Sequence, residues 1–216
     1  MKALLKLMGI FLFASLSFHT DIQAAYGAPT FNAKYVYAVN LDTGDVILNK
    51  NADAQVPIAS ITKLMTALVI TDSKLDLSEV LTISKEDIEA TKGGRRSLGL
   101  FVGAEYTREE LLLIALMSSS NRAAAALART HPAGYDGFIQ LMNDKARELN
   151  MWNTHFVDPT GLYNTNQSSP EDLVKLLQVI RNRPMIARFS TEVFYSKEHQ
   201  IERKIKVRLK NKKTKH

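Results

Sequence analysis

The stretch PIASITKLMTALVITD, residues 57–72, has the composition of a buried helix. From Ser60 onward apolar side chains occupy nearly every turn, and almost no polar face remains. A helix that is apolar all round lies inside a protein rather than on its surface. We therefore expect residues 60–72 to form a buried helix.

Two short apolar runs precede this stretch. Residues 35–39 are rich in β-branched and aromatic side chains, and residues 46–48 form a second apolar run. Between them lies the turn sequence of residues 42–45, in which Gly44 is free to adopt a positive φ. The pattern predicts a β-hairpin.

Capping patterns indicate where helices begin in the middle of the chain. Residues 107–110 form a capping box, and Ser84 is followed three residues later by an acid. Ser169 precedes a proline and two acids, which is typical of a helix start. We expect helices after Ser84, through 111–117, 121–127 and 135–149, and from Ser169 onward.

Strands are expected at both ends of the chain. Residues 80–83 form a further short apolar strand, and residues 201–210 alternate apolar with basic side chains. Strands near both ends with helices between them predict an α/β (α+β) fold, in which a sheet packs against a helical region. Trp152 is interpreted as a core residue.

Composition excludes several classes of site. The chain has 216 residues, enough for one domain with at most a small extra lobe, and it has no cysteine. Disulfide scaffolds, zinc–thiolate sites, iron–sulfur clusters and cysteine nucleophiles are thereby excluded. The net charge of +6 comes mainly from the basic tail of residues 201–216, so no nucleic-acid partner is expected. His131, His155 and His199 lack the spacing of metal ligands.

The first 24 residues have the pattern of a secretory signal peptide. Lys2 and Lys6 precede an apolar stretch that is too short to span a bilayer, and small residues follow at Ala24 and Ala25. We expect cleavage there, a mature chain of residues 25–216 without a stable membrane anchor, and a periplasmic or secreted location. An uncleaved anchor helix is the alternative.

Ser60 and Lys63 form a Ser-x-x-Lys pattern at the start of the expected buried helix. Residues three apart share a helix face, so the Lys63 amine can reach the Ser60 hydroxyl. A lysine in a dry pocket has a lowered pKa and can serve as the base that a serine nucleophile needs. Considered without its context, the pattern slightly favours the alternative of a serine cap followed by a solvated lysine.

A second polar group, residues 118–121, interrupts two apolar helices. Such a break must satisfy its hydrogen bonds, and Asn121 or one of the serines can do so by capping the next helix. The functional alternative is a hydroxyl group and an amide directed into a cleft.

Taken together, the two groups resemble the active-site motifs of penicillin-binding D-alanyl-D-alanine peptidases. Residues 57–67 are similar to the first motif of that family, and residues 119–121 to its Ser-x-Asn motif. Residues 116–125 are particularly similar to the D-alanyl-D-alanine endopeptidase branch. Further matching segments lie at residues 40–44, 51–53, 102–103, 158–162 and 169–173. The resemblance implies a penicillin-binding/β-lactamase-like transpeptidase fold, with an antiparallel sheet and a helical subdomain.

The resemblance also implies a role for each site residue. Ser60 would be the nucleophile that forms an acyl-enzyme, and Lys63 would accept its proton. Ser119 would relay the proton to the leaving amine, while Asn121 would orient Lys63 and hold the substrate amide. The expected substrate is the peptide stem of peptidoglycan, β-lactams are the expected inhibitors, and no metal or cofactor is expected.

The third motif of the family, Lys-Thr-Gly on a strand, has no counterpart here. The only candidate is residues 213–215, where lysine replaces the glycine within the basic tail. The sequence is therefore expected to be a catalytic domain that is truncated before this motif, with its C-terminal strands incomplete. A non-catalytic remnant of such an enzyme is the alternative function.

These expectations predict slow reaction with penicillin. The third motif supplies half of the oxyanion hole, and losing one such donor typically lowers the rate by about 10²–10³-fold. We expect the 216-residue chain to be acylated at least about 10²-fold more slowly than a full-length relative. Labelling with a fluorescent penicillin over time measures this rate, and rapid stoichiometric labelling would contradict the prediction.

Overall fold

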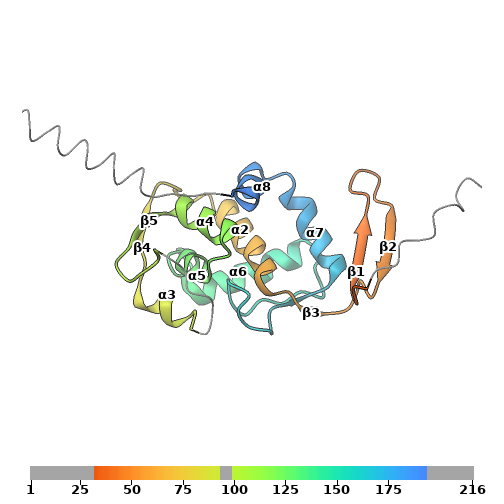
Figure 1. Cartoon of the computed structure of the whole chain (residues 1–216), viewed down its shortest axis with the longest axis horizontal. Helices are drawn as coiled ribbons and strands as arrows, with labels where there is room; N and C mark the ends of the chain where they lie inside the picture. The colour runs from red at the N-terminus through yellow and green to blue at the C-terminus, as the bar shows by residue number, and fades with distance from the viewer. Residues whose placement is uncertain (1–31, 93–98, 194–216) are drawn as a thin grey trace, which may run out of the picture. The chain divides into compact units, whose positions relative to one another are not determined.

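A computed structural model describes residues 32–92 and 99–193 of the chain (Figure 1). Short strands alternate with helices along the sequence. The elements are β1 (Val36–Val39), β2 (Val46–Lys50), β3 (Val56–Pro57), the 3₁₀ turn η1 (Ala59–Ile61), α2 (Thr62–Asp72), β4 (Val80–Thr82), α3 (Lys85–Glu89), β5 (Glu105–Thr107), α4 (Arg108–Met117), α5 (Asn121–Arg129), α6 (Gly134–Glu148), β6 (Gln167–Ser168), α7 (Pro170–Ile180) and α8 (Pro184–Thr191).

Helix α2 is the core element, as its sequence predicts. It contacts each of the helices α4 to α8 (Figure 1). Met65, Leu68 and Ile70 are completely buried, and each such side chain contributes about 1.5–3 kcal/mol of transfer free energy. The expected buried helix of residues 60–72 is confirmed, except that it begins as the 3₁₀ turn η1 and becomes α-helical at Thr62.

The predicted helix starts are confirmed by their capping hydrogen bonds. The Thr107 hydroxyl accepts from the Glu110 amide at 3.1 Å, and the Glu110 carboxylate accepts from the Thr107 amide at 2.7 Å. Ser84 forms the same reciprocal pair ahead of α3, and Ser169 caps α7. Each cap satisfies amide groups that a helix start otherwise leaves unpaired.

The expected break between α4 and α5 is also confirmed. Ser119 has a φ of +54°, and the Ser120 side chain accepts from the Ala123 amide to cap α5. Residues Ala123 to Ala128 of α5 are all buried. The small alanine side chains in this run allow close packing against α4 and α6, the helices with which α5 makes its most extensive contacts.

Within residues 32–92 and 99–193, the strands form three separate antiparallel pairs. The predicted hairpin is β1–β2, in which Val36 lies opposite Lys50, and β1 also contacts α7. Strand β3 pairs with β6, and β4 with β5. The strand expected for residues 201–210 and the signal peptide expected for residues 1–24 lie outside the described residues, so the pairing of the hairpin with 201–210 stays a prediction.

Helix α8 and the exposed position of Trp152 differ from what the sequence predicts. Helix α8 is short, and its apolar residues Ile186 and Phe189 are buried where it contacts α4 and α7. Trp152 is 70% exposed, so its interpretation as a core residue is wrong. The neighbouring Met151 and Phe156, each 1% exposed, take the buried positions of that loop instead.

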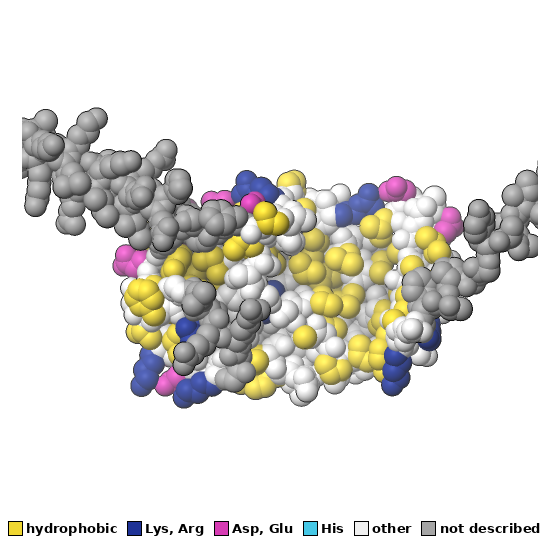
Figure 2. Space-filling view, viewed as in Figure 1, with side chains coloured by type: hydrophobic (Ala, Val, Ile, Leu, Met, Phe, Trp, Pro, Cys, Tyr) yellow, Lys and Arg dark blue, Asp and Glu magenta, His cyan; other side chains and the backbone are white. Residues whose placement is uncertain are grey.

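The surface of the described residues is mixed. Figure 2 shows apolar side chains over the middle of the face in view, while charged side chains lie mainly at its rim. Within residues 32–92 and 99–193, no helix has the length and apolar character needed to cross a membrane.

The loop of residues 158–161 packs directly against η1. Gly161 has a φ of +77°, and a Cβ atom at this position would lie 1.8 Å from the Ala59 carbonyl oxygen and 2.9 Å from the Thr62 hydroxyl. Only glycine permits so close an approach of two backbone segments. The loop and the turn that carries Ser60 are therefore held together by contact between main chains.

This contact predicts unequal effects for two glycine substitutions. Gly44 has a φ of +80°, but its Cβ position is open, so Gly44→Ala should cost about 1–2 kcal/mol for the left-handed backbone alone. Gly161→Ala should cost that amount plus about 1–3 kcal/mol for the clash with Ala59. Chemical denaturation of both variants measures the difference, and equal losses would contradict the described packing.

Candidate active site

Ser60 lies in the exposed 3₁₀ turn η1, directly before the buried helix α2. Ala59, the preceding residue, has a φ of +45°, an uncommon value for a residue other than glycine. The turn thereby leaves the Ser60 side chain accessible at the edge of the core. Its hydroxyl oxygen accepts a hydrogen bond of 3.2 Å from the Lys63 Nζ atom.

Lys63 is 3% exposed and directs its ammonium group at three oxygen atoms. Besides the Ser60 hydroxyl, Nζ donates to the Asn121 Oδ1 atom at 2.8 Å and to the Thr160 carbonyl at 2.7 Å. The three acceptors match the three hydrogens of an ammonium group. The alternative of a solvated lysine is therefore wrong, and the predicted contact of Lys63 with Ser60 is confirmed.

The environment of Lys63 changes its acidity. Burial lowers the pKa of Lys63 from 10.5 to about 8, because the charged form loses hydration, while the negative charge of Asp158 acts in the opposite direction. About a tenth of the molecules then carry a neutral amine at pH 7. A neutral amine within hydrogen-bond reach of a hydroxyl can remove its proton.

The polar break between α4 and α5 contributes Asn121 to this cluster. Asn121 is the first residue of α5, so its Oδ1 atom comes from a position fixed by the cap of that helix. Ser119 is exposed, and its left-handed backbone costs on the order of 1–3 kcal/mol, a strain that concentrates at functional sites. The approach of the Ser119 hydroxyl to Ser60 stays a prediction.

Sequence reasoning missed the third acceptor, the carbonyl of Thr160. A main-chain oxygen leaves no signature in residue type, because every residue carries one. The available signal was the turn sequence of residues 158–161, with a glycine where the loop meets η1. Thr66 of α2 also donates to the Pro159 carbonyl at 2.7 Å, so this buried loop is bound to α2 at two successive carbonyls.

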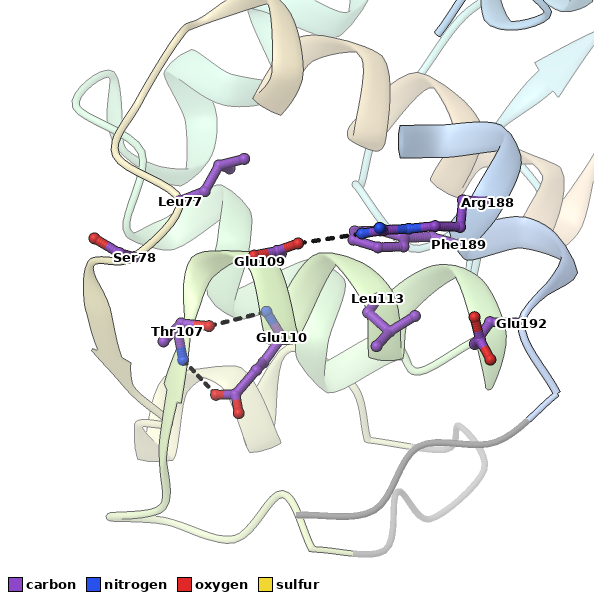
Figure 3. Close-up of a pocket in the computed structure, with 9 residues that line it drawn as sticks. All are labelled: Leu77, Ser78, Thr107, Glu109, Glu110, Leu113, Arg188, Phe189 and Glu192. Atoms are coloured by element: carbon purple, nitrogen blue, oxygen red, sulfur yellow. Dashed lines mark hydrogen bonds and ion pairs between the residues drawn. The ribbon is translucent and has the colours of Figure 1, made fainter. Parts of the chain in front are cut away.

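A pocket of about 400 Å³ lies apart from these residues, between the start of α4 and α8 (Figure 3). Glu110 in its wall belongs to the α4 capping box, and Glu109 pairs with Arg188 at 3.3 Å. Glu110 thus serves the start of α4, and Glu109 serves the contact between α4 and α8. None of Ser60, Lys63, Ser119 or Asn121 lines it.

A helical core with a Ser-x-x-Lys pair, whose lysine is buried and whose serine is exposed, and an asparagine from a second helix are typical of serine acyl-transfer enzymes that react with penicillin. A sequence profile for D-alanyl-D-alanine carboxypeptidases, Peptidase_S11, matches residues 22–216. The chain belongs to this family.

Curated relatives agree with that assignment. The chain is 43% identical over 187 residues to a D-alanyl-D-alanine endopeptidase of Pseudomonas aeruginosa, which covers 83% of this chain and 60% of the relative. It is 46% identical over 153 residues to the D-alanyl-D-alanine endopeptidase of Escherichia coli K12, and this match covers 71% of this chain and 49% of the relative. The chain thus spans about half to three fifths of the length of these relatives.

Solved structures share the fold. A D-alanyl-D-alanine carboxypeptidase of Mycobacterium tuberculosis superimposes with a TM-score of 0.70 at 30% identity, over 78% of this chain and 63% of that one. The Streptomyces K15 DD-transpeptidase gives a TM-score of 0.68 at 32% identity, over 74% and 64%. The predicted penicillin-binding peptidase fold is therefore confirmed.

The lowered pKa of Lys63 predicts how stability depends on pH. Between pH 8 and 10.5 the unfolded chain keeps a proton on Lys63 that the folded chain has released. Unfolding then takes up a proton, so the free energy of unfolding rises with pH by about 1.4 kcal/mol per unit. Relative to Lys63→Met, the free energy of unfolding of the wild-type chain should therefore increase by on the order of 2–3 kcal/mol between pH 8 and 10.5.

Lys145→Met is the matched control, measured by denaturation across the same pH range. Burial lowers the pKa of Lys145, but hydrogen bonds with Glu148 and Asp72 outweigh it and raise the pKa overall. Its stabilising contribution is fully present below the unfolded pKa and is lost only above it. The difference in the free energy of unfolding between wild type and Lys145→Met should therefore stay constant up to pH 10.5. If this difference changes with pH as steeply as the difference between wild type and Lys63→Met, the lowered pKa of Lys63 is contradicted.

Proposed function

We propose that this chain provides the catalytic centre of a serine-type D-alanyl-D-alanine peptidase, an endopeptidase or carboxypeptidase that acts on peptidoglycan peptide stems. The observation that carries the proposal is the hydrogen bond between Lys63 Nζ and the Ser60 hydroxyl, made by a lysine whose pKa is about 8. Membership of the D-alanyl-D-alanine carboxypeptidase family and the similarity to D-alanyl-D-alanine endopeptidases support the substrate class.

Acylation begins with proton transfer from Ser60 to neutral Lys63. As the proton leaves, the Ser60 oxygen bonds to the carbonyl carbon of the D-alanyl amide, and the negative charge develops on the carbonyl oxygen. The Ser60 amide N–H is one of the donors that can stabilise this oxyanion. Lys63 is then an ammonium, and its hydrogen bonds to Asn121 and Thr160 stabilise that form.

Release of the amine requires the proton to travel onward. In the proposed sequence Ser119 passes it from Lys63 to the leaving nitrogen, the carbon–nitrogen bond breaks, and an ester to Ser60 remains. Water then attacks the ester, giving its proton to the same groups and freeing the peptide carboxylate and the Ser60 hydroxyl. Penicillin is the expected inhibitor, because its strained amide enters the first half of this sequence.

We also propose that the enzyme works outside the cytoplasm. The signal-peptide pattern of residues 1–24 supports export, and the substrate class places the reaction at the cell wall. The mature chain would begin near Ala25.

The proposal predicts site-specific labelling by penicillin. A fluorescent penicillin should form a covalent ester at Ser60, detected on a denaturing gel and located by mass spectrometry of the modified peptide. Ser60→Ala should abolish the label, since no other residue takes its place. Ser119→Ala should lower the rate by about 10²-fold or more, the usual effect of losing a proton relay.

Ser118→Ala is the matched control for Ser119. The Ser118 hydroxyl donates to the Ile114 carbonyl at 2.7 Å within the last turn of α4 and has no part in the proposed reaction. Its removal should leave the labelling rate as in wild type. If wild-type protein stays unlabelled after long incubation while circular dichroism shows it folded, the chain is the non-catalytic alternative.

A further inference from the structure

We propose that Asp158 is a positioning residue of the Ser60–Lys63 pair, because it holds the Thr160 carbonyl and Gly161 against the turn that carries the nucleophile. The inference rests on the proposed function for its catalytic meaning. Its structural content rests on a set of buried hydrogen bonds in the loop between α6 and β6.

One oxygen of Asp158 organises the loop that follows it. The Oδ1 atom accepts from the Thr160 amide at 2.6 Å, from the Thr160 hydroxyl at 2.5 Å and from the Gly161 amide at 2.9 Å. Bonds to two successive amides fix the orientation of the peptide unit between them. That unit contains the Thr160 carbonyl, which accepts from Lys63 Nζ at 2.7 Å.

The other oxygen of Asp158 connects the loop to α2. The Oδ2 atom accepts from Asn166 Nδ2 at 2.9 Å and from the Tyr163 amide at 3.4 Å. Asn166 Nδ2 also donates to the Thr62 hydroxyl at 3.3 Å, and Thr62 is the residue before Lys63. Asp158 and Asn166, at 2% and 0% exposure, therefore form one buried unit that links the loop to the helix bearing the lysine.

This bonding pattern excludes a direct chemical role for Asp158. Five donors occupy its two oxygens, and the side chain is 2% exposed, so no site remains on it for a substrate or an attacking water. Asp158 acts on the reaction through the atoms that it places. Among these atoms are the Thr160 carbonyl, which accepts from Lys63, and Gly161, which contacts Ala59.

The charge of Asp158 and the hydrogen bonds that it organises both favour the protonated form of Lys63. The groups facing Lys63 from η1, α5 and the loop are the neutral oxygens of Ser60, Asn121 and Thr160, and Asp158 provides the negative charge felt at the ammonium. Tyr135 of α6 also responds to Asp158: burial, followed by the charge of Asp158, raises the pKa of Tyr135. Asp158 thus favours the protonated lysine that burial disfavours.

The test is a direct titration of Lys63 in the full chain. Protein labelled with ¹³C-lysine gives a Cε resonance for Lys63, assigned by its absence from Lys63→Arg, whose midpoint should lie near pH 8 in wild type. Asp158→Asn keeps the size of the side chain and removes its charge. The midpoint should then fall by about one pH unit, the lower end of the range for an opposite charge nearby.

Asp172→Asn is the matched control. Asp172 is 1% exposed and accepts from the Asn153 amide, the Thr154 hydroxyl and Lys175, so it is an equally buried and bonded carboxylate. A merely structural role for Asp158 would lower stability in both variants and leave both Lys63 midpoints at the wild-type value. That outcome overturns the proposal, whereas a shift confined to Asp158→Asn supports it.

A second pair of variants decides the matter if Asp158→Asn fails to fold. Thr160→Val removes the hydroxyl that donates to Asp158, while Thr160→Ser keeps it. Loss of that bond should loosen the Thr160 carbonyl, weaken its bond to the ammonium and lower the Lys63 midpoint in Thr160→Val only. Identical midpoints in the two variants overturn the proposal.

The titration is independent of catalysis, so the two proposals fail separately. If the wild-type chain never reacts with penicillin, the proposed function is contradicted, but the Lys63 midpoints still test the positioning role of Asp158. A chain that reacts with penicillin but shows no response of Lys63 to Asp158→Asn keeps the proposed function and loses the positioning role.

Discussion

The buried ammonium group of Lys63 is the interaction on which this structure depends. An ammonium group buried in the core is stable only if each of its hydrogens has a hydrogen-bond acceptor. The three acceptors come from the turn η1, the first residue of α5 and the loop at Thr160, which lie 3, 58 and 97 residues from Lys63 in the sequence. The packing of the helices around α2 therefore has to bring these three segments to one point.

Local backbone strain is arranged around that point. Ala59 and Ser119, neither of them glycine, adopt left-handed conformations at φ values of +45° and +54°, next to Ser60 and two residues before Asn121 respectively. Such residues persist only where the surrounding structure determines them. Here the surroundings are the buried helix α2, the capped start of α5 and a loop that contacts η1 through Gly161, so the stability of the core maintains the geometry of the site.

The sequence predicted those parts of the molecule that depend on local patterns. The buried helix, the β1–β2 hairpin and the capping boxes follow from side-chain periodicity and from residues three positions apart, and the Ser60–Lys63 contact follows from the same spacing. The Thr160 carbonyl escaped prediction because it is a backbone atom 97 residues from Lys63. Trp152 and α8 escaped because tertiary packing decides which apolar residues of a loop are buried and whether a short segment folds as a helix.

The number of acceptors around Lys63 also suits the lysine after it has lost a proton. A neutral amine has two hydrogens and one lone pair. The Asn121 and Thr160 oxygens can keep the two hydrogens, while the lone pair turns toward Ser60, whose hydroxyl becomes the donor of the same 3.2 Å contact. Only the direction of one hydrogen bond reverses, and no heavy atom has to move. The same arrangement of atoms therefore accommodates both protonation states, and the proton can pass between the two residues without rearrangement of the core.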